Sequence, residues 1–318
     1  MRADTVKRLA HECGFELAGV APGDPLPEAA WYLEWVARGM AGEMSYLAGP
    51  RGAMRRDPRA MLPSARSILC VGKLYNGPQP YSVDFRENGR VWISRYAWGE
   101  DYHHVVRTAL QSLVRKLTAA SPQPFECKIC VDTAPLMERA YARRAGLGWI
   151  GKNSCLINQR MGSWFFLGAL LVSLEIEPDA PPPGRCGSCT RCIDACPTAA
   201  IIPSGRSEGP SHTVDSRRCI SYLTIEQPGP VPEPLRAAVG NNVFGCDICQ
   251  DVCPWNRRAP VTAEPAFAAT HFAPLLETLG GLSEEDFAQM FRRSAVKRTG
   301  YRGWVRNVSV VLANAGLK

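Results

Sequence analysis

The sequence predicts an α/β domain at the N-terminus, a small cysteine-rich module after it and a short helical C-terminus. Three observations support this prediction. Apolar patterns typical of helices and of strands alternate over residues 1–178, a proline-rich segment follows at 177–184, and eight cysteines stand beyond it. We therefore expect domains at residues 1–178, 179–260 and 261–318.

The elements of the first domain follow from the spacing of its apolar side chains. Gly14 is placed to end the first helix, and Asp101 is placed to cap the longest one. Near the C-terminus, Ser283 and Asp286 predict a capping box. The expected helices are residues 4–13, about 102–117, 135–144, 283–291 and 301–315, and the expected strands are residues 67–75, 90–96, 125–132, 154–158 and 163–176.

The cysteines of the second domain have the spacing of an iron–sulfur protein. They are Cys186, Cys189, Cys192 and Cys196, then Cys219, then Cys246, Cys249 and Cys253. The first four read C-x2-C-x2-C-x3-C-P, in which three thiolates bind one 4Fe-4S cluster and the fourth binds a second. We expect one cluster on Cys186, Cys189, Cys192 and Cys253, and the other on Cys196, Cys219, Cys246 and Cys249. Zinc sites usually have separated CxxC pairs, and disulfides are the other alternative.

Composition is that of an ordinary globular protein, with 46% hydrophobic and 21% charged residues in a chain of 318. No segment approaches the roughly 20 apolar residues of a membrane span, and no apolar stretch follows the basic start. Thirteen cysteines and oxygen-sensitive clusters favour a reducing compartment. We therefore expect a cytoplasmic protein whose clusters pass single electrons.

Two basic stretches are candidates for binding a polyanion. Residues 51–66 contain five arginines and one acid, Asp57. Residues 292–306 contain six basic residues and no acid, with Tyr301 and Trp304 among them. Stretches of this kind are usually ordinary solvated faces. The alternative for the second stretch is a surface for phosphates and stacked bases.

Asp132 ends the predicted strand 125–132 on the same face as Cys130. It therefore either faces a crevice in which α/β sheets bind ligands or caps the helix that follows. Cys127 lies three residues before Cys130, so in a strand the two thiols point to opposite faces and cannot form a redox pair.

The segment Asp101-Tyr102-His103 begins like the D-x-H-x-x-G signature of some cobalamin enzymes, but position 106 is valine. We therefore expect a helix cap with solvent-facing histidines at this segment.

Several separated motifs resemble the epoxyqueuosine reductase (QueG) family. They are residues 95–103, 131–139, 148–153, 219–226 and 244–256, and the resemblance covers about residues 1–310. It implies a cobalamin-dependent iron–sulfur oxidoreductase that removes the epoxide oxygen of epoxyqueuosine at the wobble position of tRNA anticodons, giving queuosine. It also implies an architecture related to reductive dehalogenases.

The same resemblance implies roles for particular residues. Base-off cobalamin would lie between the α/β domain and the cluster module, and an external one-electron donor of the flavodoxin or ferredoxin type would reduce the clusters. Asp132 matches the family position of the proton donor. The remaining expected contacts are Arg55, Arg95, Leu156 and Leu167 at the corrin, with Lys152, Asn153 and Ser154 toward the substrate side.

Some family members carry C-terminal HEAT-like repeats that help to hold tRNA, and residues 261–318 should correspond to the beginning of such a repeat. A corrinoid reductive dehalogenase is the alternative function, although those enzymes usually carry a twin-arginine export signal, which this N-terminus does not show. A non-catalytic ferredoxin-type electron carrier is a second alternative, but it would give the first 178 residues no function.

Overall fold

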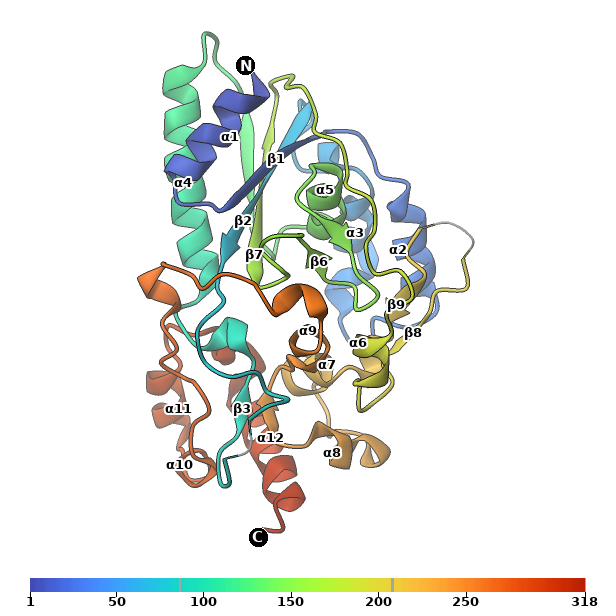
Figure 1. The fold of residues 1–318 in the computed structure, drawn as a ribbon, viewed down its shortest axis with the longest axis vertical. Coiled ribbons are helices and arrows are strands. Elements are labelled where there is room, and N and C mark those ends of the chain that lie inside the picture. The colour runs from blue at the N-terminus through green and yellow to red at the C-terminus, as the bar shows by residue number, and fades with distance from the viewer. Residues whose placement is uncertain (86, 207–208, 318) are drawn as a thin grey trace.

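The computed structural model describes residues 1–85, 87–206 and 209–317. Its largest sheet has four strands in the order β1-β2-β7-β4, and all three pairings are antiparallel. Figure 1 shows this sheet in the half of the molecule that holds the N-terminus. The strands are β1 (Leu17–Pro22), β2 (Ser67–Leu74), β7 (Phe165–Val172) and β4 (Cys127–Cys130).

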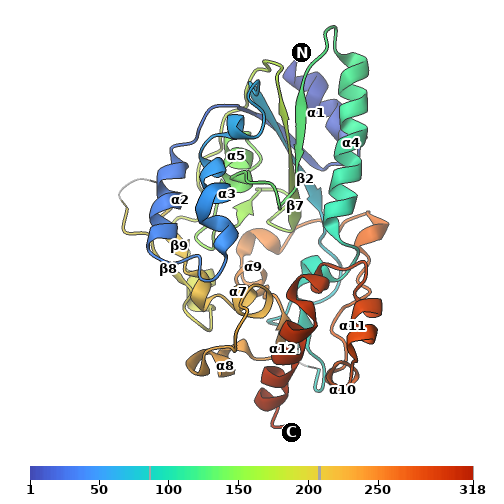
Figure 2. The same ribbon diagram turned by 180° about the vertical axis from the view of Figure 1, so that it is seen from behind.

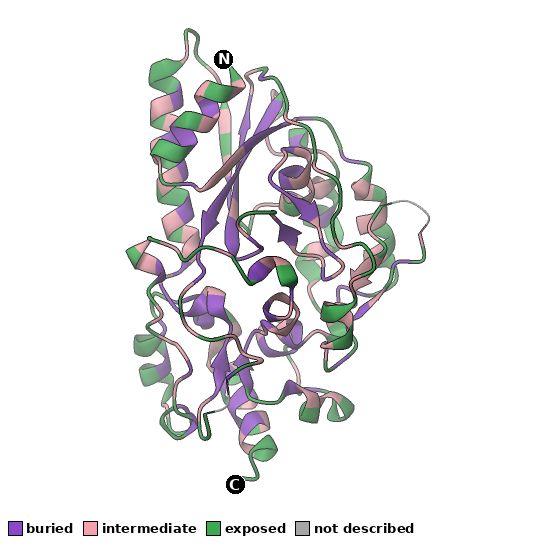
Figure 3. Cartoon of the chain, in the orientation of Figure 1, coloured by how far each residue is buried: buried purple, intermediate pink, exposed green. Residues whose placement is uncertain are grey.

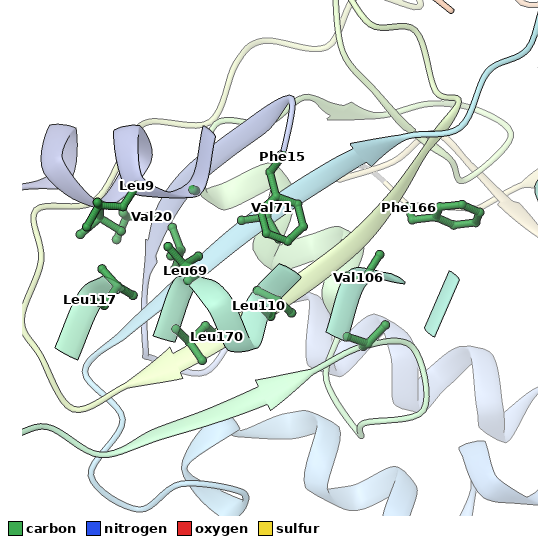
Figure 4. Close-up of a cluster of buried hydrophobic side chains, with 14 of the residues drawn as sticks. Leu9, Phe15, Val20, Leu69, Val71, Val106, Leu110, Leu117, Phe166 and Leu170 are labelled. Carbon is green, nitrogen blue, oxygen red and sulfur yellow. The ribbon is translucent and has the colours of Figure 1, made fainter. Parts of the chain in front are cut away.

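Helices cover both faces of the sheet (Figure 1). Because successive side chains of a strand point to opposite faces, Leu69 and Val71 pack against α1 and α4, whereas Ile68 and Cys70 pack against α5. Figure 4 shows the first of these two clusters, with Leu69 and Val71 beside side chains from α1 and α4. The helices are α1 (Ala3–Glu12), α4 (Tyr102–Ala120) and α5 (Glu138–Arg144).

Three of the predicted signals at helix ends are confirmed. Gly14 follows α1 with a φ of 86°, a conformation that glycine adopts without strain. Asp101 caps α4 by accepting a hydrogen bond from the backbone N–H of His103 at 3.1 Å. The expected capping box at Ser283 opens α11 (Glu284–Met290).

A second core joins segments that are distant in sequence. Trp92 and Trp98 pack with Phe244, and with Trp304 close to the C-terminus. The short strand β3 (Trp92–Ile93) pairs in parallel with β10 (Asn242–Phe244). The predicted strand 90–96 is therefore wrong in length, and it lies outside the main sheet. Figures 1 and 2 show this second core at the end of the molecule opposite the N-terminus.

The remaining elements are mostly short, and two of them, the helices of residues 276–280 and 300–314, belong to the second core. β5 pairs with β6, and β8 pairs with β9, each as a two-stranded antiparallel sheet. These elements are α2 (Glu28–Ala37), α3 (Gly49–Ala53), β5 (Trp149–Ile150), β6 (Leu156–Ile157), α6 (Arg191–Asp194), β8 (Ile201–Pro203), β9 (His212–Val214), α7 (Ile220–Ile225), α8 (Glu233–Val239), α9 (Ile248–Asp251), α10 (Leu276–Gly280) and α12 (Gly300–Asn314).

Buried residues fill the sheet and the second core, whereas the outer helices are exposed on one side (Figure 3). The second core includes Phe85 and Trp92 of the expected first domain together with Trp304 of the expected third domain, so these two domains share packing. The domain borders themselves stay a prediction. Within the described residues, no helix has the length and apolar character needed to cross a membrane.

Candidate active site and electron path

The eight cysteines of the second domain gather into two groups of four. Burial, together with the nearby thiols of Cys186 and Cys189, raises the pKa of Cys192 to about 11. Burial next to Cys186 and Cys192 raises the pKa of Cys253 to about 11 as well. These four side chains are therefore neighbours, although Cys253 is 61 positions or more from the other three.

The second group consists of the other four cysteines. Burial, together with Cys219 and Cys196, raises the pKa of the Cys246 thiol well above its usual range. A hydrogen bond with Cys155, followed by burial and by Cys246 and Cys219, does the same for the pKa of Cys249. These groups have the membership expected from the spacing, and ligation of clusters by them stays a prediction.

All thirteen cysteines are free thiols, so none of them is used in a disulfide. Among the described residues, no three His, Cys, Asp or Glu side chains are arranged to bind one metal ion together. A 4Fe-4S cluster does not need that arrangement, because each of its four thiolates binds a different iron. The donor set is therefore suited to clusters.

One short loop, residues 151–155, contacts both cysteine groups. The ammonium of Lys152 donates to the carbonyl oxygens of Gly187 and Cys189, each at 2.9 Å. The buried amide of Asn153 donates to the carbonyl of Cys249 at 3.3 Å and accepts from the N–H of Cys155 at 3.2 Å. Lys152 and Asn153 therefore hold the two cysteine-bearing loops against the α/β domain.

Ser154 occupies the turn of this loop with a φ of 63°, in the left-handed region. Its carbonyl accepts a hydrogen bond from Arg139 at the start of α5. The turn thereby aims Asn153 and Cys155 at Cys249. A contact of Ser154 with substrate stays a prediction.

Asp132 lies directly after β4, in the loop of residues 131–137 that leads to α5. Its φ is 49°, which is uncommon for a residue other than glycine, and its N–H donates to Glu138 Oε1 at 2.7 Å. The N-cap of α5 is Met137, and no side chain caps that helix. The helix-cap interpretation of Asp132 is therefore wrong, and its half-exposed carboxylate remains available for chemistry.

A chain of charged groups leads from Asp132 into the protein. His103 Nε2 lies 3.2 Å from Asp132 Oδ2, and His103 Nδ1 lies 2.7 Å from Asp101 Oδ1. The other oxygen of the buried Asp101 carboxylate binds the ammonium of Lys297 at 2.9 Å. The expectation of solvent-facing histidines is wrong for His103, whose two ring nitrogens each face a carboxylate.

These contacts set the protonation states at neutral pH. Burial disfavours the charged imidazole, but hydrogen bonds with Asp101 and Asp132 outweigh it and raise the pKa of His103 to about 9. Burial likewise opposes ionisation of Asp132, but the hydrogen bond and charge of His103 hold the pKa of that carboxyl below its usual range. Near pH 7 the pair is therefore an imidazolium beside a carboxylate.

Glu138, the first residue of α5, is a second acid next to this loop. Burial, and then the charge of Asp132, raises the pKa of Glu138 to about 8, so it carries a proton at neutral pH. The carboxyl groups of Asp132 and Glu138 thus differ in protonation, which is the usual arrangement of acid and base partners in an active site.

Three of the expected corrin contacts lie together beside the Asp132 loop. Arg55 donates to the carbonyl of Leu136 at 2.9 Å, and its buried Nε finds no partner among the described residues. Leu136 belongs to the same apolar cluster as Leu156 and Leu167. An unsatisfied guanidinium N–H next to apolar side chains is suited to a large cofactor with amide substituents.

Arg95 has a different environment. It is 2% exposed, and its guanidinium donates to the carbonyls of Gly77, Gln79 and Pro80 at 2.9–3.1 Å. It also stacks over Trp98 at 4.5 Å from the ring centre. These contacts give Arg95 a structural role. They do not support its expected contact with the corrin.

The basic C-terminal stretch is largely paired inside the protein. Arg298 makes two 3.0 Å bonds to Glu226, and Arg306 donates to backbone carbonyls that include Gly229. Trp304 is 1% exposed and packs against Phe291. The interpretation of this stretch as a platform for stacked bases is therefore wrong, because its tryptophan belongs to the second core.

Comparison with known proteins agrees with this site. A family model described as "Epoxyqueuosine reductase QueG, DUF1730" matches residues 55–133, and one described as "4Fe-4S double cluster binding domain" matches residues 185–256. The epoxyqueuosine reductase of Xanthomonas campestris pv. campestris is 41% identical over 98% of this chain and 87% of its own length. The chain belongs to the epoxyqueuosine reductase family.

Solved epoxyqueuosine reductases have the same fold. A crystal structure of an epoxyqueuosine reductase with an epoxyqueuosine-modified tRNA-Tyr stem loop has a TM-score of 0.85 and 30% identity, covering 98% of this chain and 81% of that one. The Bacillus subtilis epoxyqueuosine reductase has a TM-score of 0.84 and 29% identity over the same shares, and its catalytic aspartate loop is swung out of the active site. These relatives favour epoxyqueuosine reductase over the alternative of a reductive dehalogenase.

Sequence reasoning missed two residues of this epoxyqueuosine reductase site. The sequence indicates solvent exposure for His103 and no role for Glu138. Asp101-Tyr102-His103 carried a signal only as an incomplete motif, because the contact with Asp132 depends on α4 packing beside β4.

Proposed function

We propose that this chain reduces epoxyqueuosine at the wobble position of tRNA to queuosine, with two 4Fe-4S clusters and base-off cobalamin. One observation carries the proposal. The chain belongs to the epoxyqueuosine reductase family, and it contains both Asp132 with its charged partners and two groups of four thiols. Removing the epoxide oxygen as water consumes two electrons and two protons, and these two parts of the protein supply them.

The electrons enter from an external one-electron donor and cross the two clusters. Lys152 and Asn153 hydrogen-bond the loops of both cysteine groups to the α/β domain, which supports a short path from the clusters to the site. Arg55, Leu156 and Leu167 would hold cobalamin, the first through its free Nε–H and the leucines through apolar contact. Bound there, cobalamin would supply the low-potential cobalt centre that reduces the epoxide.

The protons come from side chains around Asp132. Asp132 is ionised at neutral pH, so it must receive a proton before it acts as an acid. His103 holds that proton on Nε2, 3.2 Å from Asp132 Oδ2, and passes it to the carboxylate as negative charge develops on the departing oxygen. Asp101 keeps the imidazole oriented through Nδ1, and Lys297 keeps Asp101 ionised.

The substrate places the enzyme where tRNA is, so we propose that it works in the cytoplasm. To test the function, tRNA nucleosides are analysed from a strain that lacks this gene and from the same strain complemented with it. We expect epoxyqueuosine to accumulate in the deletion strain and queuosine to return with the wild-type gene, but not with Asp132→Asn. Normal queuosine in the deletion strain would refute the proposal.

A further inference from the structure

A basic groove lies along the open edge of the main sheet. It has a volume of about 970 Å³, and Arg51 of α3, Arg107 and Arg115 of α4, and Lys128 of β4 line it. β4 is an edge strand in the described sheet, since it pairs only with β7. In Figure 2, α3 and α4 stand on either side of this edge. We call these residues the basic groove.

The charge of the basic groove is not neutralised within the protein. All four basic side chains belong to exposed residues, and no acidic residue lines the groove. In the described ranges, none of the four forms a salt bridge with a carboxylate. Arg51 donates to the carbonyl of Thr133, and Arg115 to the hydroxyl of Ser112 at 2.8 Å, so the acceptor in each of these bonds is a neutral group.

The groove begins at the candidate active site. Thr133, Ala134 and Pro135, which follow Asp132 directly, form part of its wall. On α4, Arg107 lies one turn after His103, and Gln111 and Arg115 follow one turn at a time, so each of these side chains neighbours the next. The residue that binds Asp132 and the basic residues of the groove are therefore on a continuous surface.

We propose that the basic groove binds phosphates of the substrate tRNA next to the nucleotide that reaches Asp132. Arg107 and Arg115 are about 12 Å apart along the helix axis, a length of about three nucleotides at 3.4 Å per nucleotide. A phosphate backbone is neutralised by basic side chains that have no acidic residues among them. The basic groove has this composition. This inference rests on the proposed function, because it names the surface by which that substrate is held.

An acidic electron-carrier protein is the other class of partner that a basic surface attracts. Such a protein must approach the clusters, but no cluster cysteine lines the groove. The walls are formed instead by α3, α4, β4 and the Asp132 loop. Position therefore favours the nucleic acid.

Charge reversal tests the groove. The variant Arg107→Glu with Lys128→Glu is compared with a control that changes the net charge equally, Arg2→Glu with Arg160→Glu, whose exposed side chains lie outside the groove. The probe is an epoxyqueuosine-containing anticodon stem loop, and binding to the holoenzyme is measured across a salt series. We expect the groove variant to bind about ten-fold more weakly or worse at low salt, with the logarithmic salt slope reduced by about one to two.

The control should bind as wild type does, and iron content should be unchanged in both variants. Equal binding by the groove variant and wild type would overturn the inference. So would a variant that binds RNA normally but accepts electrons more slowly from a reduced acidic carrier protein. If the wild-type enzyme binds the stem loop through the groove but does not convert epoxyqueuosine, the proposed function is refuted. The inference that the groove binds tRNA still holds in that case.

Discussion

At the scale of single residues, Asp132 is the group nearest to the proposed chemistry. Asp132→Asn keeps the size and polarity of the side chain but removes the acid. We expect turnover of epoxyqueuosine to fall by on the order of 10²- to 10⁴-fold, the usual contribution of a positioned acid. Single-turnover kinetics measure this, with visible spectra and RNA binding as controls. A near wild-type rate would mean that water or another acid donates the proton.

His103 should set the pH dependence of the reaction. Because its pKa is about 9, the proton that it supplies is present below that pH and is lost as the pH rises through it. The rate should therefore fall on the alkaline side near pH 9. Asp101→Asn removes a negative partner, which lowers the pKa of His103 and moves the alkaline limb to lower pH.

The pH profile of kcat/KM measures this limb in each variant. Asparagine is also a good N-cap, so the Asp101→Asn variant keeps α4 capped. Glu138→Gln serves as the control, because it removes the other group that titrates near this range, with a pKa of about 8, while keeping an acceptor for the Asp132 N–H. A limb that moves only in the Glu138 variant would assign the proton to Glu138 instead.

Sequence alone identified Asp132 but not its partners. The motif placed an acid at the end of a strand, which is local information. The contact of His103 with Asp132 joins residues 29 positions apart, and the contact of Asp101 with Lys297 joins α4 to the second core. Such contacts depend on how elements pack, so no spacing in the chain predicts them.

Among the elements, the loop of residues 151–155 connects the catalytic domain to the clusters. Lys152 places a positive charge against Gly187 and Cys189, in the loop of the first cysteine group. A positive charge favours the reduced, more negative state of a cluster. We therefore expect Lys152→Met to lower the reduction potential of the cluster on Cys186, Cys189, Cys192 and Cys253 more than that of the other.

Redox titration followed by EPR measures both potentials. Lys116→Met is the matched control, since Lys116 pairs with Glu12 on the outer side of α4, and it should move neither potential. A shift of both clusters by the same amount in the Lys152 variant would show that Lys152 acts on the whole fold instead of on one cluster.

Periodicity predicted the elements whose structure is set locally. The apolar face of α4 and the buried strands β2 and β7 have strong repeating patterns and caps, and they form where expected. The segment around Trp92 has a strand-like composition too, but its partner strand is 150 residues away in β10. Its place in the second core could not be read from its own pattern.

At the scale of the whole molecule, the two groups of thiols should hold about eight iron atoms per chain. Cys219→Ala removes one ligand of the second group and should reduce the iron to about four atoms, while sparing the other cluster. Cys127→Ala, a thiol outside both groups, should leave the iron content unchanged. Iron analysis and the EPR spectrum of the reduced protein measure both effects. Full iron in the Cys219 variant would show that another thiol, such as Cys155, is the ligand.

The central claim is that these parts act together on epoxyqueuosine in tRNA. The most direct measurement uses the purified chain, reconstituted anaerobically with iron, sulfide and cobalamin, and supplied with a one-electron reductant and an epoxyqueuosine-containing stem loop. Nucleoside analysis should show epoxyqueuosine replaced by queuosine, with two electrons consumed per product and no conversion when cobalamin is omitted. Unchanged epoxyqueuosine with both clusters and cobalamin in place would contradict the account.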